Sequence, residues 1–107
     1  MIARLRRYFA RRRLKPVLNV LPRRLSESFG VSDYATFGQA KRVITGMHLH
    51  KSVERYAYAT ACRLSELDKG FPLSADDYQR VRVELAELFG LRSSEFTIKD
   101  LLTVQSV

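Results

Sequence analysis

Arginine side chains are concentrated at the start of the chain. The stretch RLRRYFARRR at residues 4–13 holds six arginines in ten positions, with two aromatic residues between them. Guanidinium groups form paired hydrogen bonds to phosphate, and aromatic rings stack on unpaired bases. These residue types at this density predict a segment that binds polyanions, with RNA favoured over DNA. The predicted contact residues are Arg4, Arg6, Arg7, Tyr8, Phe9, Arg11, Arg12, Arg13, Lys15, Arg23 and Arg24.

The charge of the chain is divided unevenly. Residues 1–24 hold nine basic side chains and no acidic one, whereas the remaining residues hold ten basic and eleven acidic ones. The net charge of +8 therefore belongs almost wholly to the first quarter of the chain. If residues 2–14 form a helix, Ile2, Leu5 and Phe9 share a narrow apolar stripe and the arginines surround it. Repulsion among these arginines predicts that the helix needs the body of the protein or an anionic surface to stabilise it.

Other interpretations of the basic segment stay open. It could be a docked terminal helix whose arginines are only solvated, an anchor to an anionic membrane surface, or a contact for an acidic protein partner or a second copy of the chain. Its composition also fits an organellar transit peptide, but a secretory signal is not expected, because Pro16, Asn19 and Pro22 interrupt the apolar stretch that follows. The expected location is the cytoplasm, with the inner face of the membrane as the alternative.

Residues that could support catalysis or metal binding do not form a recognisable site. His48 and His50 form a His-x-His pair without a third ligand nearby, and DKGFPLSADDY has glycine and proline where a calcium loop needs oxygen ligands. Cys62 lies in an apolar stretch that offers nothing to activate a thiolate. We therefore expect no metal, no cofactor, no small-molecule substrate and no enzymatic activity. A deep polar pocket in the body would contradict the last expectation.

Helices are expected to position the basic segment. A chain of 107 residues with 46% hydrophobic residues suffices for one core, and no stretch alternates strictly enough for a strand. The sequence predicts an all-α fold, a compact bundle of five to six short helices. We divide it into an Arg-rich N-terminal helix or arm at 1–16 and a single all-α domain at 17–107. The predicted helices of the domain cover 22–29, starting with proline, then 37–46, 52–67, 75–89 and a short segment after Thr97.

Capping signals fix several of these helix ends. Thr36 and Gln39 have the spacing of a capping box, and Ser74 and Gly90 suit the N-cap and the C-terminal end of helix 75–89. The alanines of 52–67 predict a central helix that neighbours approach closely. Helix 75–89 is expected to form solvent-exposed ion pairs between Asp76 and Arg80 and between Arg80 and Glu84. The pair 37–46 and 52–67 also has the lengths of a helix-turn-helix, but YAYATAC gives the second helix no polar face, so direct base readout is not expected.

Two stretches of the sequence are similar to each other. LSESFGVSDYATF at 25–37 and LAELFGLRSSEFTI at 85–98 share a helix that ends in Phe-Gly, then a loop and a threonine cap. Either both use the same common capping pattern, or a helix–turn–helix unit is duplicated about a pseudo-twofold axis.

The middle of the chain resembles a group of small uncharacterised bacterial proteins of about this length. The run FGVSDYATFGQAKRVITGMHLHKSVERYAYATAC carries this resemblance over about a third of the chain. It implies a compact helical domain and brings no activity with it. The matching positions are Phe29, Gly30, Tyr34, Thr36, Gln39, Tyr56, Ala57 and Ala59.

Overall fold

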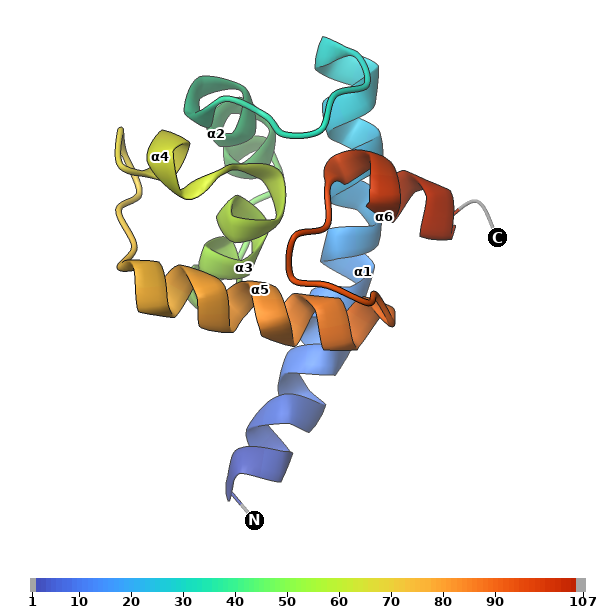
Figure 1. Cartoon of the computed structure of the whole chain (residues 1–107), viewed down its shortest axis with the longest axis vertical. Helices are drawn as coiled ribbons and strands as arrows, with labels where there is room; N and C mark the ends of the chain where they lie inside the picture. Colours follow the sequence, from blue (N-terminus) through green and yellow to red (C-terminus); the bar gives the residue numbers. More distant parts are fainter. Residues whose placement is uncertain (1, 106–107) are drawn as a thin grey trace.

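The chain folds into a bundle of helices, which confirms the predicted all-α class (Figure 1). The computed structural model describes the backbone of residues 2–105 and the side chains of residues 16–103, and it contains six helices and no strand within that backbone. None of these helices is long and apolar enough to cross a membrane. The helices are α1 (Ile2–Phe29), α2 (Phe37–Gly46), α3 (Lys51–Ala61), α4 (Leu64–Leu67), α5 (Ala75–Phe89) and α6 (Ile98–Gln105).

Helix α1 is continuous, although it contains Pro16 and Pro22. The prediction that a helix begins at Pro22 is therefore wrong, because Pro22 lies inside α1. A proline inside a helix removes a backbone hydrogen bond and destabilises the helix by about 3 kcal/mol. Burial of one apolar side chain contributes about 1.5–3 kcal/mol, so several on one face offset that loss. The buried residues of this face recur at steps of three and four: Leu18, Leu21, Pro22 and Leu25.

Helix α3 lies at the centre and packs against α1, α2, α4 and α5, as its alanines predicted. The predicted single helix over 52–67 is wrong in extent, because α3 ends at Ala61 and α4 is separate. Donors from distant segments bind the carbonyl groups that a longer helix would use. The Ala61 carbonyl accepts from the Ala35 amide at 2.8 Å, and the Cys62 carbonyl accepts from the Tyr78 hydroxyl at 2.8 Å. These tertiary hydrogen bonds replace the next turn of the helix.

The predicted caps of α2 and α5 are confirmed. The Gln39 amide donates to the Thr36 hydroxyl at 3.2 Å while the Thr36 amide donates to the Gln39 side chain at 3.1 Å. Ser74 accepts a hydrogen bond from the Asp77 amide at 3.0 Å. Gly90, with φ 68°, ends α5 in the left-handed conformation. Local sequence signals therefore set both ends of α5 and the start of α2.

The polar side chains on α5 pair differently from the prediction. Arg80 forms an ion pair with Asp77 rather than with Asp76. Glu84 accepts a hydrogen bond from the Tyr56 hydroxyl at 2.6 Å, so it contacts α3 instead of Arg80. Burial, together with this carboxylate, raises the pKa of Tyr56 to about 12. Glu84 therefore belongs to the contact between α5 and α3, and not to the solvent-exposed side of α5 as the sequence predicted.

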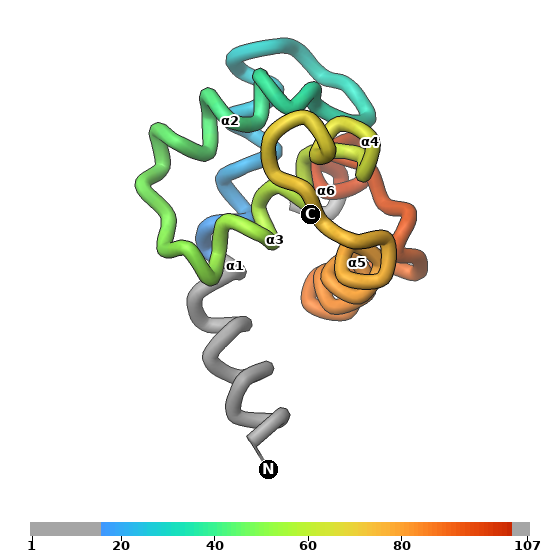
Figure 2. The backbone as a smooth tube through the Cα atoms, turned by 90° about the vertical axis from the view of Figure 1, so that its left-hand side faces the viewer, coloured from blue at the N-terminus to red at the C-terminus, as the bar shows by residue number. Residues whose placement is uncertain are grey.

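The two similar stretches have the same local structure but not the same packing. Each ends its helix at a glycine with positive φ, 83° at Gly30 and 68° at Gly90, and each is followed by a threonine in a reciprocal cap. Helix α2 packs against α1, the helix that precedes it. Helix α6 packs mainly against α1 as well, and not against α5, the helix that precedes it. In Figure 1 α5 runs across the direction of α1, and Figure 2 views α5 almost along its axis. The arrangement does not support a duplicated unit.

Candidate polyanion-binding face

Most of the predicted contact residues lie in the first half of α1. The side chains of Arg4, Arg6, Arg7, Tyr8, Phe9, Arg11, Arg12, Arg13 and Lys15 are outside the described residues, although their backbone belongs to α1. Arg23 and Arg24, in the described part of the same helix, are exposed. The continuous helix thus connects the Arg-rich segment directly to these two arginines without a loop between them.

Helix α2 brings further positive charge next to α1. The two helices pack against each other, and Lys41 and Arg42 on α2 are exposed. Together α1 and α2 contain eleven basic residues and one acidic residue, Glu27, whereas the rest of the chain contains eight basic and ten acidic residues. Lys41 and Arg42 were not among the predicted contacts, because only the packing of α2 places them beside α1. The absence of acidic residues from 37–46 is the sequence signal for them.

The exposed cations that the structure describes on this pair of helices form no ion pair with a carboxylate of the protein. Among the side chains of residues 16–103, the ion pairs join Lys69 to Glu66, Arg80 to Asp77 and Lys99 to Asp33. None of them involves the basic residues of α1 or α2 that this part of the chain contains. The described part of this face therefore offers positive charge to an external anion.

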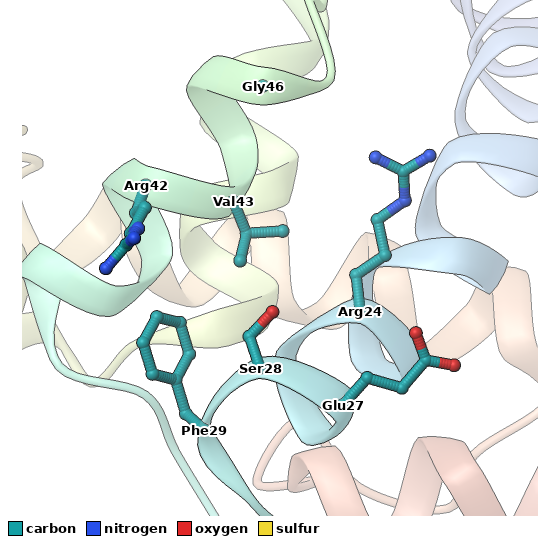
Figure 3. Close-up of a pocket in the computed structure, with 7 residues that line it drawn as sticks. All are labelled: Arg24, Glu27, Ser28, Phe29, Arg42, Val43 and Gly46. Carbon is teal, nitrogen blue, oxygen red and sulfur yellow. The ribbon is translucent and has the colours of Figure 1, made fainter.

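A groove of about 460 Å³ lies between the end of α1 and α2 (Figure 3). Arg24 and Phe29 border it from α1, and Arg42 and Val43 border it from α2. Glu27 adds the only acidic side chain of this lining. The groove thus combines two guanidinium groups, an aromatic ring and an aliphatic surface.

Neither histidine of the His-x-His pair has a metal environment. His50 is the N-cap of α3, where its Nδ1 accepts a hydrogen bond from the Ser52 amide at 3.2 Å. His48 has a positive φ of 53° in the preceding turn. Among the described residues, no three His, Cys, Asp or Glu side chains are gathered closely enough to hold a metal ion.

Cys62 is fully buried at the end of α3, and its environment suppresses thiolate formation. Burial, reinforced by Glu66, raises the pKa of the thiol from about 9 to about 12. The thiolate is the reactive form, and a pKa raised this far leaves only a very small fraction of Cys62 as thiolate near pH 8. We expect Ellman's reagent to modify native Cys62 at least about a hundredfold more slowly than the chain unfolded in guanidinium chloride, because burial and the raised pKa both oppose the reaction. Labelling of the native protein at the rate of a free thiol would contradict this assignment.

Arg82 is a buried cation that the sequence pattern did not single out, and it is 2% exposed. Its Nε donates to the Ser94 carbonyl at 2.9 Å, its Nη1 donates to the Ala59 carbonyl at 3.0 Å, and its Nη2 donates to the Phe96 carbonyl. The guanidinium carbon lies 3.7 Å from the centre of the Phe96 ring. Burial lowers the pKa of Arg82, and the residue joins α5 to α3 and to the loop before α6. Its spacing of four residues from Tyr78 and three from Leu85 places it within the apolar stripe of α5.

The fold and the basic face define a small all-α domain with one strongly cationic helix pair. The model of a family of unknown function, DUF6559, matches residues 5–106. The chain therefore belongs to this family, which agrees with the predicted resemblance to a group of small uncharacterised proteins. Neither a curated protein nor a solved structure matches the chain.

Proposed function

We propose that this protein is a small, non-enzymatic cytoplasmic domain that binds polyanions, RNA foremost, through α1 and the adjacent surface of α2. The observation that carries the proposal is the separation of charge. Eleven basic residues and one acidic residue share two packed helices. The ion pairs among residues 16–103 include none of the four described cations of those helices, Arg23, Arg24, Lys41 and Arg42. A surface of this kind attracts phosphate backbones and gains free energy when their condensed counterions are released.

The type of cation favours RNA as the ligand. Residues 1–24 contain eight arginines and one lysine. Arginine forms two parallel hydrogen bonds to a phosphate and stacks on bases, whereas lysine acts as a point charge. Tyr8 and Phe9 add aromatic rings that unpaired RNA bases can stack on. Binding should depend strongly on salt and weakly on sequence.

Replacement of the six arginines at 4–13 by glutamine in the full chain tests this proposal. Arginine and glutamine have similar helix propensities, so the change removes charge with little effect on α1. Each phosphate contact with single-stranded nucleic acid contributes about 0.7 to the slope of log K against log salt. We expect the variant to lose up to about 4 units of that slope for a single-stranded RNA, together with most of its affinity at low salt. Fluorescence anisotropy at several salt concentrations measures both quantities.

A matched variant controls for net charge alone. Six exposed cations of the body are replaced by glutamine, which lowers the net charge by the same amount: Lys51, Arg55, Arg63, Lys69, Arg92 and Lys99. This variant is expected to retain most of the salt slope. Equal losses in both variants would mean that no particular face binds RNA. Tighter binding to vesicles of anionic lipid than to RNA would replace the proposed ligand by a membrane surface.

A further inference from the structure

An aromatic ring is exposed where α1 ends. Phe29 is the last residue of α1, and 37% of its surface is accessible. Gly30, with φ 83°, turns the chain away immediately after it, and the chain returns as α2 on the other side of the groove. Most phenylalanines are covered by the core, but this ring borders an open groove (Figure 3). The helix end thus presents an aromatic surface to an external group.

One guanidinium group lies beside this ring, and a second lies on the other side of the groove (Figure 3). Arg24 comes from the preceding turns of α1 and Arg42 from α2, so they approach the groove from different helices (Figure 3). Val43 supplies an aliphatic surface between them. Gly46 leaves its end of the groove open, because a Cβ added there would meet no atom within 4 Å. The groove, of about 460 Å³, is open to solvent along its length.

We propose that this groove binds one unpaired nucleotide of a single-stranded RNA, with its base stacked on Phe29 and its flanking phosphates on Arg24 and Arg42. The ring and Arg42 lie on one side of the groove and Arg24 on the other, so a base on the ring can have a phosphate next to each guanidinium (Figure 3). Stacking and charge neutralisation are the two contributions that bind single strands. Glu27 lies on the Arg24 side of the groove, where its carboxylate can accept hydrogen bonds from a ribose or base donor (Figure 3).

This inference rests on the proposed function and extends it. The Arg-rich part of α1 attracts any polyanion, whereas the groove selects a nucleic acid whose bases are free to leave the stack. Bases of a perfect duplex are paired and stacked, so they cannot reach Phe29 without the unfavourable opening of a base pair. The protein is therefore expected to prefer single-stranded RNA over duplex RNA of the same charge.

Phe29→Ala in the full chain tests the stacking contact. Removal of one base–aromatic stack is expected to weaken binding to a single-stranded RNA by about 5- to 150-fold and to leave the salt slope unchanged. Affinity for inorganic polyphosphate, which has no bases, should stay the same. A 2-aminopurine base in the RNA should lose fluorescence on binding to the wild-type protein and much less on binding to the variant. Arg42→Gln should instead reduce the salt slope by about 0.7.

Two conservative variants separate stacking from other effects. Phe29→Leu keeps an apolar side chain without a flat ring, and it should lose nearly as much RNA affinity as Phe29→Ala. Val31→Ala changes an apolar side chain that is 61% exposed, lies two residues away and does not line the groove, and it should change nothing. Full affinity in Phe29→Leu, or equal weakening of RNA and polyphosphate by Phe29→Ala, would overturn the nucleotide site.

The failure of this inference can be told apart from failure of the proposed function. If the wild-type protein binds neither RNA nor polyphosphate, the proposed function itself is wrong and the nucleotide site falls with it. The wild-type protein could instead bind both RNA and polyphosphate, with equal affinity for duplex and single-stranded RNA. If Phe29→Ala then leaves RNA affinity unchanged, the protein binds polyanions but the proposed nucleotide site is wrong.

Discussion

Arg82→Ala is expected to destabilise the domain by about 3–5 kcal/mol, a large part of the 5–15 kcal/mol that usually separates folded from unfolded domains. The guanidinium donates to the carbonyls of Ala59, Ser94 and Phe96, and all three acceptors would lose this donor. Each buried acceptor without a partner costs about 1–3 kcal/mol. Removal of a desolvated cation offsets part of this loss, because a buried charge is itself unfavourable.

The contacts of Arg82 also explain why lysine should not replace it. The three carbonyls each bind a different nitrogen of the planar guanidinium, and the single ammonium nitrogen of lysine cannot contact all of them. An ammonium also cannot stack on the Phe96 ring as a guanidinium does. We therefore expect Arg82→Lys to lose more than half as much stability as Arg82→Ala. The free energy of unfolding in urea measures both losses.

Arg80→Ala is the matched control for Arg82→Ala. Arg80 lies two residues away on the same helix, and its side chain is exposed and paired with Asp77. Exposed pairs of this kind contribute about 0.3–0.5 kcal/mol, so the variant should be nearly as stable as the wild type. A loss below about 1 kcal/mol for Arg82→Ala would show that the carbonyls find other donors or water and that the fold does not depend on this residue.

Leu21→Ala is expected to destabilise the domain by about 2–5 kcal/mol. Leu21 is fully buried on the face of α1 that packs into the bundle, and its truncation removes apolar contacts and leaves a cavity. Thermal unfolding monitored by circular dichroism measures the loss. The effect tests whether the part of α1 that contains Pro16 and Pro22 is held in place by its buried face.

Val20→Ala is the matched control for Leu21→Ala. Val20 precedes Leu21 on α1 but is 39% exposed, so its truncation removes little buried surface. The change should cost less than about 0.5 kcal/mol, as most surface substitutions do. Equal losses at both positions would mean that α1 packs on the bundle through a different face.

Helix ends with local signals could be predicted from the sequence, whereas those set by distant segments could not. Ser74, Gly90 and the Thr36–Gln39 pair act on backbone groups within three or four residues, so the ends that they define are correct. The end of α3 at Ala61 depends on hydrogen bonds from Ala35 and Tyr78, which only the folded chain brings close. A helical pattern over 52–67 gives no sign of these donors.

The same limit applies to the candidate site. The charge of α1 is readable from the sequence, and Arg23 and Arg24 lie on its exposed surface. The groove beside them depends on how α2 packs against α1, so Phe29 and Arg42 could not be recognised as neighbours. Arg82 could have been suspected, because an arginine at a core position of α5 needs partners inside the protein.

Helix α1 packs against α2, α3 and α6, and it therefore joins segments from both ends of the sequence. This element cannot detach without exposing apolar surface on all its neighbours. The amide protons of its buried part, residues 18–25, should therefore exchange with solvent only when the whole domain opens. The binding of an anion to α1 is then linked to the unfolding equilibrium of the whole domain. Any anion that binds the native helix more tightly than the unfolded chain raises the melting temperature of the entire protein.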